Sequence, residues 1–203
     1  MTPSTRRTAV VLYGPPGAGK DTVTEALLRD SGYVAYRRLK VGDTGARGTG
    51  TYRMTTAADL DGLDRAGTLL YVNRRYGNVY AVDVTELDTL TSTWRIPVVH
   101  LGQVEGIRAV TAYPARWIRA LLWCPRDVTA RRVTARGSTD LDARLRVWDA
   151  TREDLDAHPD QEFDIVARTD HLTPEQTADL VRTATAGATL APQAVRDLVE
   201  VLT

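Results

Sequence analysis

Ten residues near the start of the chain constrain its fold more than any other segment. They run from Leu12 to Asp21 and read Leu-Tyr-Gly-Pro-Pro-Gly-Ala-Gly-Lys-Asp. They follow an apolar run over residues 8–13, which predicts a buried strand, and apolar residues recur at helical spacing from Val23 onward. A strand, a glycine-rich loop ending in lysine, and a helix are the order that a phosphate-binding loop requires. We therefore expect an α/β fold whose first loop binds phosphate.

The residue types of this loop suit an anion. Its glycines permit backbone conformations closed to other residues, so that N–H groups can approach phosphate oxygens closely. Lys20 adds a positive charge near the β- and γ-phosphates, and the helix predicted over residues 21–30 directs its positive end at the same anion. The loop is thus expected to hold the phosphates of ATP through Gly14, Pro15, Gly17, Ala18, Gly19, Lys20, Asp21 and Thr22.

The residue after the loop lysine is usually a serine or threonine that ligates Mg²⁺. Here it is Asp21, followed by Thr22. A carboxylate also suits magnesium, directly or through a water, and its negative charge beside a triphosphate makes the metal harder to dispense with. Asp21 is alternatively an acidic residue favoured by the helix dipole. We expect Mg²⁺ as a cofactor, with Asp21 or Thr22 as its protein ligand.

Composition excludes several classes of protein. The 203 residues fit one domain, and the net charge of zero argues against a general nucleic-acid binder. No stretch approaches the roughly 20 apolar residues of a membrane span, and residues 1–7 are polar, which leads us to expect a cytoplasmic protein without a membrane partner. A single cysteine, Cys124, rules out an internal disulfide and is expected to be a small core residue.

Strand and helix patterns alternate along the chain. Strands are predicted at 8–13, 69–72, 79–82, 96–101, 118–123 and 163–167, and helices at 21–30, 57–66, 84–90, 127–135, 174–185 and 192–202. A further helix starts at Asp140 as its cap and carries Leu141, Leu145, Trp148 and Leu155 on one face. This βα alternation predicts a mostly parallel sheet covered by helices on both faces, a three-layer αβα fold.

With these elements, residues 8–182 resemble the guanylate kinase-like group of P-loop kinases. That group has a small acceptor-binding insertion with an Arg-x-x-Arg-x-Gly-Glu stretch, and the corresponding run here is Arg37 to Asp43. Residues 76–81, Tyr-Gly-Asn-Val-Tyr-Ala, are similar to its Gly-Asn-x-Tyr-Gly turn. The resemblance implies one kinase domain with a core at 8–35 and 84–203, an insertion at about 36–83, and acceptor-binding residues Arg37, Lys40, Asp43, Tyr52, Tyr71, Tyr80 and Gln103.

The positions that read guanine in that group differ in this chain. Its glutamate and its Ser or Thr are replaced by Tyr71 and Val82, and neither accepts a hydrogen bond from a guanine N–H as a carboxylate does. The Gly-Lys-Asp end of the loop and the Tyr80-Ala81-Val82 run also resemble ribose 1,5-bisphosphate phosphokinases, relatives of guanylate kinase. The acceptor is thus expected to be a nucleoside monophosphate, without specificity for GMP, or alternatively a sugar phosphate.

A basic segment at about 131–146 is similar to the lid of the same group. Residues 131–140, Arg-Arg-Val-Thr-Ala-Arg-Gly-Ser-Thr-Asp, precede an Arg-x-Leu helix. The resemblance implies that Arg132, Arg136 and Arg144 close over the phosphates and act with Lys20 in catalysis, whereas Arg131 and Arg146 are expected to face solvent.

The segment from Val98 to Gly106 takes the place of the family's Asp-x-Asp-Val-Gln-Gly and lacks both aspartates. Gln103 and Glu105 are its polar candidates at the carboxyl end of a strand, where ligands of such sheets bind. His100 lies beside them and is more often a satisfied core residue in this setting.

The chain is therefore expected to transfer the γ-phosphate of ATP to a small phosphate-bearing acceptor. A non-catalytic nucleotide-binding module is the alternative of a different class. Scaffolds of that kind typically lose the glycine-rich loop and its lysine, and this sequence retains both. The sequence leaves the oligomeric state open.

Overall fold

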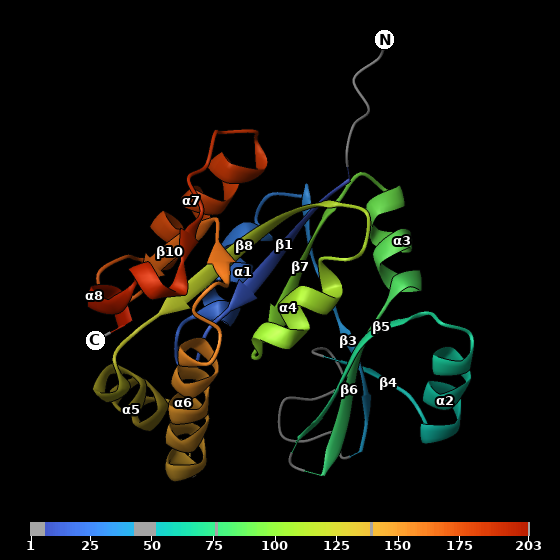
Figure 1. Cartoon of the computed structure of the whole chain (residues 1–203), viewed down its shortest axis with the longest axis horizontal. Coiled ribbons are helices and arrows are strands. Elements are labelled where there is room, and N and C mark those ends of the chain that lie inside the picture. Colours follow the sequence, from blue (N-terminus) through green and yellow to red (C-terminus); the bar gives the residue numbers. More distant parts are fainter. Residues whose placement is uncertain (1–6, 43–51, 76, 139, 203) are drawn as a thin grey trace.

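The architecture is that of a computed structural model, which describes residues 7–42, 52–75, 77–138 and 140–202. Its central sheet consists of five parallel strands: β1 (Thr8–Tyr13), β2 (Tyr33–Ala35), β7 (Ile96–Leu101), β8 (Arg116–Trp123) and β10 (Ile165–Arg168). Their order across the sheet is β2-β7-β1-β8-β10 (Figure 1). In the register, Tyr13 pairs with Leu101 and with Leu121, so that β1 and β7 end level beside the loop that follows β1, and β8 continues to Trp123.

Helices cover both faces of this sheet. On one face α1 (Lys20–Leu27) and α7 (Pro174–Thr185) pack on alternate strand residues such as Val10 and Leu12. On the other face α3 (Val84–Ser92), α4 (Val104–Val110) and α6 (Leu141–Asp156) pack on Val11 and Tyr13. Strands buried on both faces explain the continuous apolar run that precedes the loop. The predicted three-layer α/β fold is confirmed.

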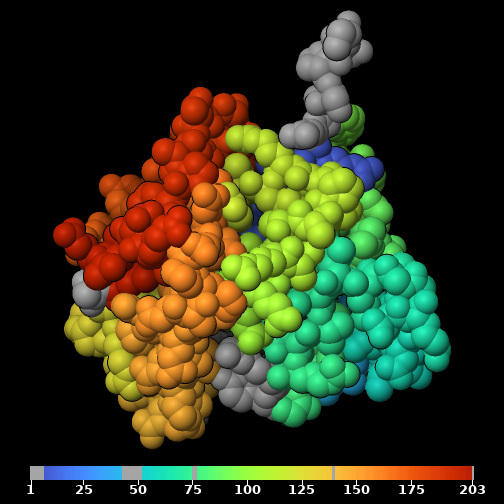
Figure 2. Space-filling model, viewed as in Figure 1, coloured from blue at the N-terminus to red at the C-terminus, as the bar shows by residue number. Residues whose placement is uncertain are grey.

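A second, smaller sheet lies beside the core. It comprises β3 (Arg38–Val41), β4 (Tyr52–Met54), β5 (Leu69–Arg75) and β6 (Asn78–Asp83) in the order β4-β3-β6-β5, with α2 (Ala57–Arg65) between β4 and β5 in the chain. Leu39, Leu60 and Ala81 form its own apolar core. In the space-filling view this teal and green lobe forms one flank of the molecule, and the orange and red C-terminal part forms the other (Figure 2).

Tyr36 and Asp83 join this insertion to the central sheet. The Asp83 N–H donates to the Tyr36 hydroxyl at 2.9 Å, and that hydroxyl donates to the Asp83 carboxylate at 3.0 Å. Arg53 of β4 also donates to this carboxylate. Burial, followed by the nearby Asp83 charge, raises the pKa of Tyr36, which therefore stays a neutral donor. Hydrogen bonds thus join Tyr36, where the chain leaves the central sheet, to Asp83, where it returns.

The helix predicted over 192–202 is wrong. In its place are β11 (Gln193–Ala194), paired with β9 (Glu162–Phe163), a 3-10 turn at Val195–Asp197, and the short helix α8 (Val199–Leu202). The Val195 N–H donates to the carbonyl of Gln161, a tertiary contact that takes the place of a helical bond. The apolar residues of this segment, Val195, Leu198 and Leu202, are nevertheless buried in the core. The short elements thus bury the same side chains that a helix was expected to bury.

Four further elements were not predicted. They are β2, which follows Gly32, α4, which contains Gly106, and the short strands β3 and β4, which flank a glycine-rich stretch. Glycine weakens both helix and strand propensity, which hid these elements in the sequence. Within the described ranges, no helix combines the length and hydrophobicity needed to cross a bilayer.

Candidate active site

The phosphate-binding loop connects β1 to α1 at the centre of the sheet. Gly14 has a φ of 151°, and a Cβ there would lie 2.1 Å from the Leu122 carbonyl oxygen, so only glycine fits between the strands. Gly19 is the N-cap of α1 with a φ of 85° and provides no side-chain cap. The first N–H groups of α1 are thus not capped by that residue, which suits an anion at this helix end.

Lys20 folds back over the loop that precedes it. Its Nζ donates to the carbonyl oxygens of Gly14 at 2.6 Å and Pro15 at 2.9 Å. These contacts hold the ammonium group within the loop, and the side chain also lines the cleft described below. The position is compatible with the predicted role at the β- and γ-phosphates.

Asp21 lies beside His100 at the mouth of the loop. The Asp21 Oδ1 is 3.5 Å from His100 Nδ1, and His100 Nε2 is 2.7 Å from the hydroxyl of Thr24. That hydroxyl also donates to the Lys20 carbonyl oxygen at 2.9 Å. His100 therefore connects the carboxylate to the first turns of α1 and is more than the core residue that the sequence suggests.

The residues present fit the predicted magnesium. The Asp21 side chain is 54% exposed and lines the cleft next to the loop, whereas the Thr22 hydroxyl donates to the Gly19 carbonyl oxygen at 2.9 Å. Among the described residues there is no group of three or more metal-ligating side chains. One carboxylate together with substrate phosphates is how Mg²⁺ is usually bound at such sites. Asp21 is thus the better placed of the two predicted ligands.

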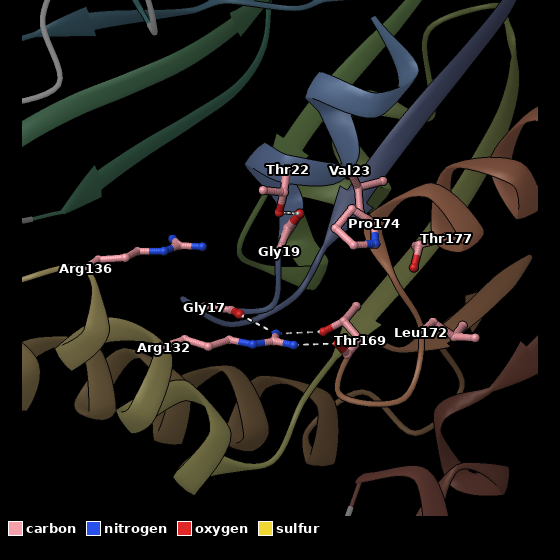
Figure 3. A pocket seen from close by; sticks show the side chains of 10 residues that line it. All are labelled: Gly17, Gly19, Thr22, Val23, Arg132, Arg136, Thr169, Leu172, Pro174 and Thr177. Atoms are coloured by element: carbon pink, nitrogen blue, oxygen red, sulfur yellow. Dashed lines mark hydrogen bonds between the residues drawn. The ribbon is translucent and has the colours of Figure 1, made fainter. Parts of the chain in front are cut away.

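Helix α5 (Arg126–Ala135) contacts the backbone of the loop through two side chains. The Thr129 hydroxyl donates to the Pro16 carbonyl oxygen at 3.0 Å. Arg132 donates to the Gly17 carbonyl oxygen at 2.8 Å, to the Thr169 hydroxyl at 3.1 Å and to the Thr169 carbonyl oxygen at 2.5 Å (Figure 3). The side chain predicted to contact phosphate is therefore engaged with the backbone around the loop.

A small cavity of about 220 Å³ opens on the α7 side of the loop (Figure 3). Its walls combine the loop, lid arginines and the connection between β10 and α7: Gly17, Gly19, Thr22, Val23, Arg132, Arg136, Thr169, Leu172, Pro174 and Thr177. Its residues from 169 onward were not predicted from the sequence. The available signal was the capping box of α7, Thr173 with Gln176, and Pro174 at the helix start, directly after a strand of the parallel sheet.

A larger cleft of about 1240 Å³ lies between the loop, the insertion and the lid. Ten of the predicted site residues line it: Gly14, Gly17, Gly19, Lys20, Asp21, Arg37, Tyr52, Tyr80, Arg136 and Arg144. The loop and the insertion thus face the same space, although 17 residues or more separate Lys20 from Arg37 and Tyr52 in the chain.

The insertion presents cations and phenols to this cleft. Arg38 lies opposite Tyr52 and Lys40 opposite Tyr80 in the strand register. The Arg38 guanidinium is 5.2 Å from the Tyr80 ring centroid, and Lys40 Nζ is 5.4 Å from that of Tyr52. Lys40 is only 5% exposed, whereas Arg38 lines the cleft. Strand alternation puts Arg38 on the face of Lys40, and the predicted contact Arg37 lines the same cleft.

Tyr71 and Gln103 contact each other and do not line the cleft. The Tyr71 hydroxyl donates to Gln103 Oε1 at 2.6 Å. The Tyr71 ring lies against Gly106, where a Cβ would be 2.8 Å from ring atom Cε1. This pair joins β5 of the insertion to the start of α4. Asp43, a further predicted acceptor contact, lies outside the described residues.

Two of the arginines between residues 131 and 146 line the cleft, the exposed Arg136 and the half-buried Arg144. Arg131 and Arg146 are exposed, as predicted, and do not line it. Asp140 begins α6, but its side chain makes no capping hydrogen bond, contrary to the prediction. It accepts instead from Ser138 and from Arg144 Nε, at 3.0 Å, and these contacts, Ser138 first, lower the pKa of Asp140.

The far end of α6 is anchored in the core. Asp154 Oδ2 accepts from the Tyr13 hydroxyl and from the Val104 N–H, each at 2.8 Å. One carboxylate thus connects α6 to the last residue before the loop and to the first turn of α4. The Trp148 indole N–H also donates to the carbonyl of buried Cys124 at 3.0 Å, and burial raises the pKa of the Cys124 thiol.

Comparisons with known proteins agree with this architecture. No family model and no curated protein sequence matches the chain. Among solved structures, a guanylate kinase from Anaplasma phagocytophilum matches with a TM-score of 0.62 and 17% identity, covering 98% of this chain and 96% of that one. An unliganded sugar kinase from Janibacter sp. HTCC2649 matches with a TM-score of 0.54 and 15% identity, covering 90% and 96%. The chain has the fold of the guanylate kinase-like P-loop kinases.

Proposed function

We propose that this protein is an ATP- and Mg²⁺-dependent phosphotransferase whose acceptor is a phosphate group on a small molecule. The observation that supports the proposal is one cleft with positively charged side chains on two of its walls. Lys20 and the loop form one wall, and Arg38, Tyr52 and Tyr80 of the insertion form part of the other. Transfer between two phosphates requires both anions to be held in one space in line with each other.

The donor fits the loop side. Its triphosphate would follow the loop glycines to Lys20, and its base would enter the small cavity next to Leu172 and Pro174, whose apolar surfaces suit a flat ring. When bound, Mg²⁺ would offset the negative charge of the donor phosphates, and Asp21 would hold the metal directly or through a water.

The acceptor phosphate fits the insertion side. Arg38 provides a planar fork for bidentate contact, and the Tyr52 and Tyr80 hydroxyls are further donors. Lys40 lies buried next to both rings and adds positive charge to the same face. Arg37 also lines this wall and remains a predicted contact.

Catalysis in such a site rests on position and charge. The transition state of phosphoryl transfer is loose and spreads its charge over peripheral oxygens. Lys20, Arg136 and Arg144 would offset this charge, and closure of the lid over the cleft would exclude water. An acceptor phosphate is already ionised at neutral pH, so no strong general base is required.

A nucleoside monophosphate is the acceptor class that we favour. The cleft, at about 1240 Å³, is large enough for the donor phosphates and a second nucleotide together. Tyr71 and Val82 in place of guanine-reading groups argue against GMP specificity. A sugar phosphate is the second candidate, since such an acceptor needs no group that reads a base.

The test is an ADP-release assay with ATP, Mg²⁺ and a panel of nucleoside monophosphates and ribose 1,5-bisphosphate. At least one acceptor should stimulate ADP formation, and Lys20→Ala should abolish that stimulation. Arg29→Ala is a matched control because Arg29 is an exposed residue of the same helix region and pairs with Glu175. If ATP binds but no phosphorylated acceptor stimulates ADP formation, the chain is a nucleotide-binding module and the proposal fails.

A further inference from the structure

Asn73 lies on the cleft-facing side of β5 and lines the cleft. In the register it pairs with Tyr80 of β6. Its two neighbours in sequence, Val72 and Arg74, point to the opposite side of the strand, where Val72 packs on the core of the insertion. The half-buried Asn73 carboxamide makes no hydrogen bond within the described part of the chain. A partly buried amide that faces a cavity without a protein partner is suited to a ligand.

The neighbouring strands place Asn73 at a defined distance from the acceptor phosphate site. Asn73, Tyr80 and Lys40 form a row across β5, β6 and β3. Adjacent strands lie about 4.8 Å apart, so the Asn73 backbone is about 5 Å from that of Tyr80 and about 10 Å from that of Lys40. If Arg38 and Tyr80 hold the phosphate of a nucleotide, its sugar or its base therefore lies within reach of Asn73.

The central sheet and its connections also contribute apolar groups to the cleft lining. These are Ala35, Tyr36, Val98 and Leu101, and they lie in the same lining as the polar residues Thr24, Glu25 and His100. Tyr71, two residues before Asn73, does not line the cleft. Its hydroxyl donates to Gln103, and its ring packs against Gly106. Apolar groups and an amide in one cleft suit the flat face and the polar edge of a nucleobase.

We propose that Asn73 is a specificity-determining residue that reads the base of a nucleoside monophosphate acceptor. The proposal rests on the proposed function and deepens it. A carboxamide offers one acceptor oxygen and a donor N–H₂ group, so it pairs with a base edge that presents a donor beside an acceptor. Such an edge differs from that of guanine, whose two N–H donors suit a carboxylate.

The experiment measures dissociation constants by isothermal titration calorimetry for AMP, CMP, dTMP, GMP and ribose 5-phosphate. The proteins are the unmodified chain, Asn73→Ala and Asn73→Leu, the second of which keeps the side-chain volume and suits a strand. Both variants should bind the preferred monophosphate about tenfold more weakly, the loss expected for one hydrogen bond. Both should bind ribose 5-phosphate as the unmodified chain does, because its phosphate contacts are intact.

The matched control is Arg74→Ala, on the other side of the same strand, which should change neither constant. Equal losses for the nucleotide and for ribose 5-phosphate would show a structural role and overturn the proposal, as would unchanged binding of all five compounds. If the unmodified chain binds ribose 5-phosphate but no nucleoside monophosphate, the base-reading role fails while the kinase proposal stands. If it binds none of the five, the proposed function fails and the role of Asn73 fails with it.

Discussion

The guanidinium of Arg132 on α5 donates a hydrogen bond to the carbonyl oxygen of Gly17 in the phosphate-binding loop, at 2.8 Å. The same guanidinium reaches Thr169 at the end of β10. One lid-proximal side chain thus links the loop to the connection that lines the small cavity. Its neighbour Arg136, one helical turn further along, lines both the cavity and the cleft. The two arginines are therefore expected to act differently.

Arg132→Ala should lower the free energy of unfolding by about 1–3 kcal/mol, because it leaves backbone acceptors around Gly17 and Thr169 without their donor. It should also raise the KM for ATP. Arg136→Ala should leave stability unchanged within about 0.5 kcal/mol and lower kcat, because Arg136 lines the cleft in which we propose that the phosphates bind. Urea unfolding and steady-state kinetics on both variants check this, and equal stability losses would contradict it.

Arg38 and Arg37 provide a second matched pair. Arg38 faces the cleft beside Tyr80, whereas the exposed Arg37 precedes β3. Arg38→Ala should raise the acceptor KM about 10- to 100-fold with little change in the KM for ATP, as expected for the loss of a charge-assisted contact. Arg37→Ala should raise the acceptor KM as well, but less. A larger effect of Arg37→Ala would show that the phosphate binds at the entry to β3.

The Tyr71–Gln103 hydrogen bond should stabilise the docking of the insertion onto α4. Tyr71→Phe and Gln103→Ala should each lower the free energy of unfolding by about 1 kcal/mol. A double-mutant cycle should give a coupling energy of about 0.5–1.5 kcal/mol, because the two side chains contact each other directly. Additive effects of the two substitutions would argue that the contact contributes nothing to stability.

Asp170 should make stability depend on acid pH. Arg168 donates to both of its carboxylate oxygens, at 2.9 and 2.8 Å, and this contact lowers the pKa of Asp170. Because the folded-state pKa is lowered, the stabilisation is full above the ordinary aspartate value of about 4 and is lost as the pH falls through the folded value.

The corresponding measurement compares the unmodified chain with Asp170→Asn in chemical unfolding from pH 7 to pH 3. The difference in unfolding free energy should be about 1 kcal/mol at pH 7 and should shrink below about pH 4. Arg168→Gln should remove the same pH-dependent part, since it removes the partner. A difference that stays constant across this range would mean that the ion pair does not contribute.

Local sequence signals predicted the parts of the site that are local in the chain. The loop from Gly14 to Lys20 could be predicted from residue order alone, because its strand, turn and helix are adjacent in the chain. The resemblance to a kinase motif indicated Arg37 and Lys40, whereas the place of Arg38 beside Lys40 follows from the two-residue alternation of a strand. That alternation was not visible while β3 itself was unrecognised.

Contacts between segments that are distant in the chain could not be predicted from the sequence. The engagement of Arg132 with Gly17, of Tyr71 with Gln103 and of Asp21 with His100 depends on how the sheet brings separate strands level. The prediction of a C-terminal helix failed for the same reason, since the Val195 N–H donates to the distant Gln161 carbonyl oxygen and not within a helix. Apolar spacing predicted that this segment packs on the core but not which hydrogen bonds it makes.

The most direct test of the central claim is to follow the reaction of ATP with its best acceptor by ³¹P NMR. The acceptor's phosphomonoester signal should be replaced by the two coupled signals of a diphosphate as ADP appears, and Lys20→Ala should show neither change. Formation of inorganic phosphate with an unchanged acceptor signal, or of a second phosphomonoester on a hydroxyl group, would contradict transfer to phosphate.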